Sequence, residues 1–137
     1  SPSHIWVARR QGRPVGLVLE AIAPDGYSGE IALLIGISAE GEVTGVRVTA
    51  HRETPGLGDY IDIAKSRWIT QFNGKSLTNP RESAWKVRQD GGAFDARAGA
   101  TITPRAVVKG VKSALLYFVG HRAELLALQP KATHPDN

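Results

Sequence analysis

The sequence predicts a single α+β domain, with a largely antiparallel sheet flanked by helices and a long C-terminal helix. Two observations lead to this fold class. Segments rich in β-branched and apolar residues fill the first part of the chain, separated by turn formers, and the clearest helical periodicity lies near the end. Strands grouped before a long helix favour an α+β arrangement over an alternating, parallel one. The 137 residues are enough for one domain with a substantial core.

The first two predicted strands are Ile5-Trp6-Val7-Ala8 and residues 15–22, separated by the turn-like Gln11-Gly12-Arg13-Pro14. A dense group of turn formers follows at residues 24–29, Pro-Asp-Gly-Tyr-Ser-Gly. We expect a surface turn here, although Gly26-Tyr27-Ser28-Gly29 would also suit the mouth of a pocket.

The next two strands flank the predicted hairpin turn Ala39-Glu40-Gly41-Glu42. Residues 31–38 are almost wholly apolar, which predicts a central strand buried on both faces. Residues 43–49 carry valines with β-like spacing, but the alternation is imperfect around Gly45. This irregularity indicates a β-bulge.

The middle of the chain has weaker patterns. Residues 51–58 are predicted to form a loop, and Ile61, Ala64 and Trp68 recur at the spacing of a helix from about Tyr60 to Ile69. A polar connection over residues 73–82 leads to a short predicted strand over residues 84–88. All three tryptophans are expected in the core: Trp6, Trp68 and Trp85.

The last predicted helix begins with Thr103 as its N-cap and Pro104 in its first turn. Gly120 is expected to kink this helix or divide it in two, and the chain from Pro130 onward is predicted to fray. Six residues form one apolar stripe: Val107, Val108, Val111, Leu115, Phe118 and Val119.

The composition excludes several chemistries. The chain has no cysteine, which rules out disulfides, thiolate catalysis and cysteine-ligated metal centres. Its four histidines form no pair at helical spacing, so we expect no metal site. The net charge is +4 with dispersed basic residues, which we interpret as mainly solvated surface. Because position 1 is not methionine, Ser1 is expected to follow a tag or a point where a longer protein was cut.

Two loops are candidates for ligand binding. In Ala98-Gly99-Ala100-Thr101, small residues precede a hydroxyl just upstream of a helix start, where backbone amides can hold a phosphate. The same pattern also suits a tight connection whose threonines cap the helix. Glu53-Thr54-Pro55-Gly56-Leu57-Gly58 can wrap a planar ligand or simply link a strand to a helix capped by Asp59. The residue pattern leaves both pairs of alternatives open.

Three segments together resemble a known family: residues 26–29, 51–58 and 99–108, in this order. They resemble the FMN-binding domain shared by the G subunit of the bacterial Rnf electron-transport complex and the C subunit of the sodium-pumping NADH:quinone oxidoreductase. The longer shared stretches favour the Rnf G subunit. The resemblance implies an FMN-binding domain over residues 5–128, and the remaining residues 129–137 are predicted to form a flexible tail.

In that family the last residue of Asp-x-x-Ser/Thr-Gly-Ala-Thr carries FMN through a phosphoester bond, made by a dedicated flavin transferase that uses FAD. Asp95 matches the aspartate, Thr101 is the implied acceptor, and Ala98 replaces the usual hydroxyl residue. Thr103 is the competing hydroxyl, which we assign to capping. The resemblance implies no catalytic residue and no metal, and these cofactor-binding residues: Thr101 (covalent FMN), Gly99, Ala100, Ile102, Thr103, Glu53, Thr54, Gly56 and Leu57.

The resemblance also implies a redox subunit of a ferredoxin:NAD oxidoreductase-type complex rather than a stand-alone enzyme. Its partners would be the other subunits and the flavin transferase, with no nucleic acid. It would lie on the periplasmic face of a bacterial inner membrane, held by an N-terminal anchor preceding these residues. Two alternatives are a module that binds flavin or another small ligand non-covalently, and a basic domain that binds nucleic acid or anionic membrane.

Overall fold

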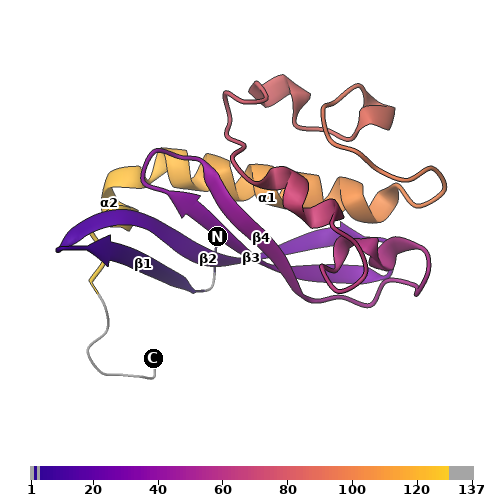
Figure 1. Cartoon of the computed structure of the whole chain (residues 1–137), viewed down its shortest axis with the longest axis horizontal. Coiled ribbons are helices and arrows are strands. Elements are labelled where there is room, and N and C mark those ends of the chain that lie inside the picture. Colours follow the sequence, from indigo (N-terminus) through magenta and orange to yellow (C-terminus); the bar gives the residue numbers. More distant parts are fainter. Residues whose placement is uncertain (1, 3, 130–137) are drawn as a thin grey trace.

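The structure is a computed structural model that describes residue 2 and residues 4–129. Its strands form one antiparallel sheet in the order β1-β2-β3-β4, and a long helix packs against it (Figure 1). The predicted α+β fold class is confirmed. The strand bounds are β1 (Ile5–Arg10), β2 (Arg13–Gly26), β3 (Gly29–Ser38) and β4 (Val43–Ala50).

Tight turns set the register of the sheet. Gln11 and Gly12 link β1 to β2 with φ angles of 52° and 78°, the positive values that a type I′ hairpin turn requires. Between β3 and β4, Gly36 pairs with Gly45 but Ile37 pairs with Val43. The intervening Thr44 is therefore an extra residue, and the predicted bulge beside Gly45 is confirmed.

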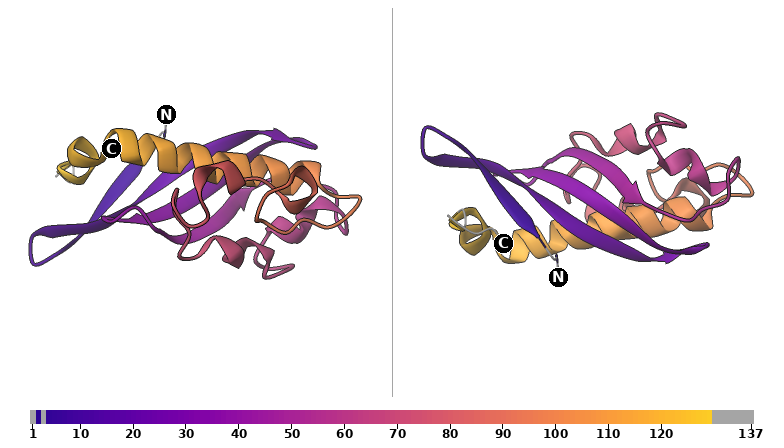
Figure 2. Two further views of the ribbon diagram at one scale, coloured as in Figure 1. Left: turned by 90° about the horizontal axis from the view of Figure 1, so that it is seen from above. Right: turned by 90° about the horizontal axis from the view of Figure 1, so that it is seen from below.

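The helix α1 (Ile102–Gly120) covers one face of the sheet (Figures 1 and 2). Most of its predicted apolar stripe is buried, but Val119 is 56% exposed and faces solvent, so its assignment to the stripe is wrong. A break at His121 separates α1 from α2 (Arg122–Leu126), as expected from Gly120. The core joins inward residues of helix and sheet: Leu17, Leu19, Ile31, Leu33, Ile35, Ile37, Val107, Val111, Leu115 and Phe118.

The outer face of the sheet is less buried than the sequence predicted. Ala32 and Leu34 of β3 are only half-buried, because α1 covers the opposite face. Trp6 is 52% exposed, so its predicted place in the core is wrong, whereas Trp85 is buried and Trp68 half-buried. Central β3 is therefore fully enclosed on one side only.

Residues 51–101, here called the excursion, connect β4 to α1 and gather near the N-terminal half of that helix (Figure 1). The predicted helix from Tyr60 to Ile69 is wrong. Asp62 accepts a hydrogen bond from the Ala64 amide at 2.9 Å, and Ser66 accepts one from the Trp68 amide at 3.1 Å. Such side-chain acceptors compete with helical hydrogen bonding. The excursion instead contains four 3-10 helices: η1 (Gly58–Ile61), η2 (Trp68–Phe72), η3 (Glu82–Ala84) and η4 (Arg88–Asp90).

The predicted strand over residues 84–88 is also wrong. Trp85 and Val87 are buried alternately, as a strand would require, but Val87 forms only an isolated bridge with Phe94. The pattern reflects packing around Phe94, whose ring stacks on Phe72 at 4.9 Å and lies 4.7 Å from the ring of Trp85. These aromatic side chains extend the sheet–helix core into the excursion as part of one continuous hydrophobic cluster.

Within the part of the chain that the structure describes, no helix combines the length and apolar character needed to cross a bilayer. Most of the tail predicted over residues 129–137 lies outside the described residues, so its flexibility stays a prediction.

Candidate functional site

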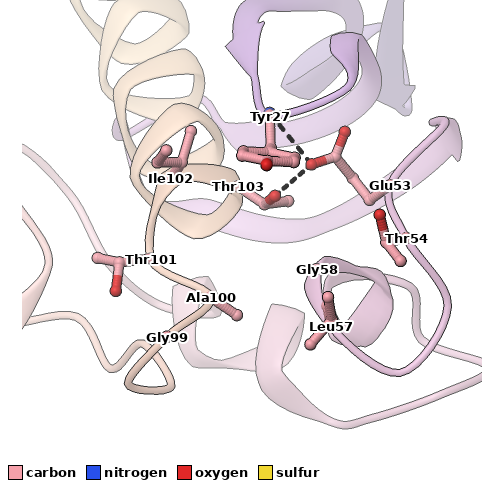
Figure 3. Close-up of a pocket in the computed structure, with 10 residues that line it drawn as sticks. All are labelled: Tyr27, Glu53, Thr54, Leu57, Gly58, Gly99, Ala100, Thr101, Ile102 and Thr103. Atoms are coloured by element: carbon pink, nitrogen blue, oxygen red, sulfur yellow. Dashed lines mark hydrogen bonds between the residues drawn. The ribbon is translucent and has the colours of Figure 1, made fainter.

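A pocket of about 170 Å³ opens where three segments meet at the N-terminus of α1 (Figure 3). The segments are the β2–β3 turn, the loop after β4 and the connection into α1. Eight of the nine predicted cofactor-binding residues line the pocket: Glu53, Thr54, Leu57, Gly99, Ala100, Thr101, Ile102 and Thr103. Gly56 is not among the lining residues, and its amide donates to Asp59 at 2.9 Å.

Glu53 joins the three segments. It is only 4% exposed, and its carboxylate accepts hydrogen bonds from the amides of Tyr27 at 3.1 Å and Ser28 at 3.0 Å. The hydroxyl of Thr103 donates to the same carboxylate (Figure 3). A buried carboxylate is costly unless such donors compensate it. Both oxygens are engaged within the protein, so Glu53 builds the pocket wall.

The N-terminus of α1 differs from the prediction. The helix begins at Ile102 with Thr101 as its N-cap, and no side chain caps it. The predicted capping role of Thr103 is wrong, because this residue lies inside the first turn and donates its hydroxyl to Glu53. Pro104 remains compatible with the first turn, where its missing N–H removes no helical hydrogen bond. The Ile102 and Thr103 amides have no acceptor within the helix.

The two threonine hydroxyls have opposite environments. Thr103 is 3% exposed, and the Glu53 carboxylate holds its hydroxyl. Thr101 is half-buried, and its hydroxyl makes only a long 3.4 Å contact with the Arg97 carbonyl oxygen. Figure 3 draws Thr101 on the opposite side of the backbone from Glu53. A hydroxyl hydrogen bond is normally about 2.7 Å long, so the Thr101 hydroxyl is only weakly held.

The residues before Thr101 form a tight turn. The Ala100 amide donates to the Arg97 carbonyl at 3.1 Å, and Gly99 has φ +81°, as the third residue of a type II turn requires. The hydroxyl of Tyr60 donates to the Ala100 carbonyl at 2.8 Å and accepts from the Arg97 amide at 2.9 Å. Gly99 and Ala100 therefore belong to a defined turn, and the buried phenol of Tyr60 holds that turn through both hydrogen bonds.

Asp95, which the motif aligns with the family's aspartate, is held by its backbone. Its amide donates to the Gln71 side chain at 2.9 Å, and its carbonyl accepts from the Trp68 indole at 2.6 Å. Its carboxylate is 68% exposed and pairs with Arg88. Trp68 and Gln71 of η2 therefore fix the start of the segment that runs from Asp95 to Thr101.

Gly58 makes room for the contact between Glu53 and Thr103. A Cβ at Gly58 would lie 2.6 Å from the Thr103 hydroxyl oxygen and 3.2 Å from the Glu53 Cβ. At Gly99 and Gly56, by contrast, the corresponding space is open. The pocket is therefore closely packed where Gly58 meets Glu53 and Thr103, and its backbone is open at Gly99.

Three exposed apolar side chains surround the pocket: Tyr27 at 70%, Leu57 at 56% and Ile102 at 47%. Apolar residues exposed together beside a pocket are typical of a surface that a ligand or partner covers. Tyr27 could have been identified from the sequence, because it lies in one of the three resemblance segments.

An ion pair joins η4 to the first turns of α1. Arg105 of α1 holds Asp90 of η4 through two hydrogen bonds of 2.7 and 3.0 Å, and these bonds lower the pKa of the Asp90 carboxyl.

Burial raises the pKa of the Tyr60 phenol, outweighing the amide and charge of Arg97, which lower it. Tyr60 therefore stays neutral and keeps both its donor and its acceptor capacity at ordinary pH. The sequence offered little to identify it, beyond an aromatic residue with a polar tip next to a motif loop.

The fold and pocket describe a small-ligand module built at a helix N-terminus, which suits a phosphate-bearing ligand. The sequence matches the FMN-binding domain family over residues 26–116, and the chain belongs to this family. The resemblance to the Rnf G subunit is confirmed. The chain is 54% identical over 134 residues to the G subunit of the ion-translocating oxidoreductase complex of Pseudomonas aeruginosa (strain UCBPP-PA14), covering 98% of this chain and 63% of that relative. The corresponding protein of Shewanella baltica (strain OS223) is 54% identical over 128 residues, covering 93% and 60%.

Solved structures share the fold. NqrC from Shewanella oneidensis matches with a TM-score of 0.67 at 24% identity, covering 90% of this chain and 61% of that one. The C subunit of the Na(+)-translocating NADH-quinone reductase from Parabacteroides distasonis matches with a TM-score of 0.57 at 23% identity, covering 92% and 63%. The chain thus spans less than two thirds of the length of these relatives.

The residues at the pocket fit FMN. The amides of Ile102 and Thr103, which have no acceptor within the helix, suit its phosphate, and the apolar rim suits one face of its ring. The pocket volume of about 170 Å³ lies below the ~300 Å³ at which pockets usually enclose a ligand. The ring of a bound flavin would therefore extend beyond the pocket.

Proposed function

We propose that this chain is the flavin-carrying domain of an electron-transfer subunit, with FMN joined through its phosphate to the hydroxyl of Thr101. The observation that carries this proposal is the contrast between two hydroxyls. Thr101 offers a weakly held hydroxyl at the start of α1, whereas the hydroxyl of Thr103 is buried against Glu53.

Attachment would be a group transfer from FAD. The Thr101 oxygen attacks the FMN phosphorus, the phosphoanhydride bond breaks, AMP leaves, and the transferase takes the hydroxyl proton. The negative phosphodiester would then lie beside the positive end of α1, which favours negative charge. The electropositive N-terminus and the small residues Gly99 and Ala100 both support this placement.

The shallow pocket favours a covalent link over simple binding. A site that encloses little of its ligand gains little affinity from burial, and a tether holds the cofactor without it. When bound, flavin supplies one-electron redox chemistry, while the protein attaches and orients it. Leu57, Thr54 and Ile102 would border the ring, whereas Gly56 supports the loop.

The wider setting is proposed from the relatives. Proteins named as the G subunit of an ion-translocating oxidoreductase complex are 54% identical to this chain. We infer that the domain passes electrons within such a complex and contacts its other subunits and a flavin transferase. We place it on the periplasmic face of the inner membrane, anchored by a helix that precedes these residues. If full-length protein fractionates with membranes, and protease added to the periplasm cleaves this domain, the placement is supported.

Co-expression with an active FAD-dependent flavin transferase tests the attachment. Denaturing gels should show flavin fluorescence migrating with the chain, lost in Thr101→Ala and retained in Thr103→Val. The valine keeps the shape of Thr103, and Glu53 keeps its two amide donors. Fluorescence that disappears on denaturation indicates non-covalent flavin, and fluorescence lost only in Thr103→Val overturns the assignment.

A further inference from the structure

Tyr60 lies outside the three short motif segments at residues 26–29, 51–58 and 99–108, yet it is closely linked to the acceptor threonine. It belongs to η1, is 1% exposed, and its ring packs edge-on against Trp68 at 5.8 Å. Its hydroxyl reaches the turn that immediately precedes Thr101. The sequence separation of about forty residues makes this a tertiary contact between two parts of the excursion.

One phenolic oxygen fixes both ends of that turn. It donates to the carbonyl of Ala100, the last residue of the turn, and accepts from the amide of Arg97, the first. The guanidinium of Arg97 also lies over the Tyr60 ring at 4.3 Å. The turn is thus held from the side opposite the solvent by a single side chain.

Besides these contacts, the turn is closed by its own hydrogen bond from the Ala100 amide to the Arg97 carbonyl. Arg97, Ala98 and Gly99 are exposed, and Gly99 adds conformational freedom that other residues lack. Without Tyr60, this turn would sample other backbone conformations, and Thr101 would move with it. A transferase that accepts one conformation would then find only a fraction of molecules competent, which lowers its rate by that fraction.

We propose that Tyr60 is a positioning residue for the modification of Thr101, and that its hydroxyl holds the Arg97–Ala100 turn in the conformation that the flavin transferase uses. This inference rests on the proposed attachment of FMN at Thr101. The chain's own contribution to attachment then includes an ordered turn as well as a weakly held hydroxyl.

Tyr60→Phe tests the inference, because it removes the hydroxyl and keeps the ring. The ring keeps its packing against Trp68, so the variant should fold, while the Arg97 amide and the Ala100 carbonyl lose their phenolic partner. Losing two hydrogen bonds should lower kcat/KM for flavin attachment about tenfold. Amide exchange at Arg97 and Ala100 should rise by a similar factor. Tyr117→Phe, a half-buried control whose ring stacks on His121, should change neither quantity.

A double-mutant cycle separates positioning from general destabilisation. Ala98 is the second residue of the turn, where proline presets the required φ, so Ala98→Pro should stiffen the turn independently of Tyr60. Tyr60→Phe should therefore cost less attachment in the Ala98→Pro background than in the wild type. An equal cost in both backgrounds, or normal attachment by Tyr60→Phe, overturns the inference. If the wild type itself accepts no flavin, the proposed function fails, and amide exchange still reports whether Tyr60 orders the turn.

Discussion

The sheet–helix half of the molecule and the excursion hold their backbones in different ways. β1–β4 and α1 satisfy their backbone groups through regular hydrogen-bond ladders. The excursion has only short 3-10 turns, and side chains supply many of its anchors. For example, the Trp85 indole donates to the Ser76 carbonyl at 2.8 Å, and the Trp68 indole donates to the Asp95 carbonyl at 2.6 Å.

The candidate site lies where these two halves meet. The sheet–helix half contributes the start of α1 and the β2–β3 turn, and the excursion contributes the loop of Glu53 and the turn before Thr101. Regular structure at the start of α1 therefore provides the amides for a phosphate, whereas the irregular excursion presents Thr101, the proposed acceptor. Damage to either half should therefore affect the site differently.

The largest effects are expected from aromatic truncation in each half. Phe94→Ala in the excursion and Phe118→Ala in α1 both remove fully buried rings, and each should lower the free energy of unfolding by about 3–5 kcal/mol. Only Phe94→Ala should also slow flavin attachment under conditions where both variants are folded, because it loosens the segment that carries Thr101. Denaturant unfolding and initial attachment rates measure both effects. If either alanine variant fails to fold, the corresponding leucine variant is used in its place. Equal attachment rates for the Phe94 and Phe118 variants would contradict the different roles of the two halves.

The next largest effect is expected at the junction. Glu53→Gln replaces one carboxylate oxygen with an amide group, so the Tyr27 and Ser28 amides can no longer both be satisfied as they are now. The expected loss is about 1.5–3 kcal/mol, with faster amide exchange at Tyr27 and Ser28. Glu82→Gln, an exposed control on η3, should stay within about 0.5 kcal/mol of the wild type. Unchanged exchange at Tyr27 and Ser28 would show that Glu53 does not join the segments.

Gly58→Ala tests the close packing at the same junction. Its methyl group would crowd the Thr103 hydroxyl, and overpacking of this kind costs about 1–3 kcal/mol. Gly120→Ala is the matched control, because an added Cβ there meets nothing within 4 Å. Thermal unfolding should show a loss for Gly58→Ala alone. If the thermal unfolding midpoint of Gly58→Ala equals that of the wild type, the side chains of Glu53 and Thr103 can shift to accommodate the methyl group, and the close packing at this junction does not matter for stability.

The smallest effect concerns the ion pair that ties η4 to α1. Because Arg105 lowers the pKa of Asp90 in the folded state, the pair stabilises the protein above the unfolded pKa of about 3.9. That contribution is lost as pH falls through the lower folded-state pKa. Both groups are solvated, so Asp90→Asn should lower the unfolding temperature only slightly at pH 7, and less in high salt. The difference from the wild type should vanish at the most acidic pH, and a constant difference would refute the assignment.

The sequence predicted the regular half better than the excursion. The hairpin turn at Gly41, the bulge beside Gly45 and the division after Gly120 follow from local residue types, and the structure contains each of them. The helix over residues 60–69 failed because Asp62 and Ser66 take backbone amides that a helix would have used. Apolar spacing alone does not reveal such competition.

For the site as well, features set by neighbouring residues were predicted correctly and features set by distant contacts were missed. Local motifs identified most of the pocket lining, because those residues lie in loops close to the chemistry. They did not identify Tyr60, whose role depends on a long-range contact, and they gave Thr103 the wrong role. The capping pattern of Thr103 and Pro104 is local, whereas the buried partner Glu53 lies 50 residues away.

Tandem mass spectrometry of the flavin-modified chain can identify which threonine carries the FMN. Trypsin cleavage after Arg97 and Arg105 releases residues 98–105, which contain both Thr101 and Thr103. If FMN is joined to Thr101, the fragment ions will place the added mass of FMN, less one water, on Thr101. An added mass on Thr103 would contradict it.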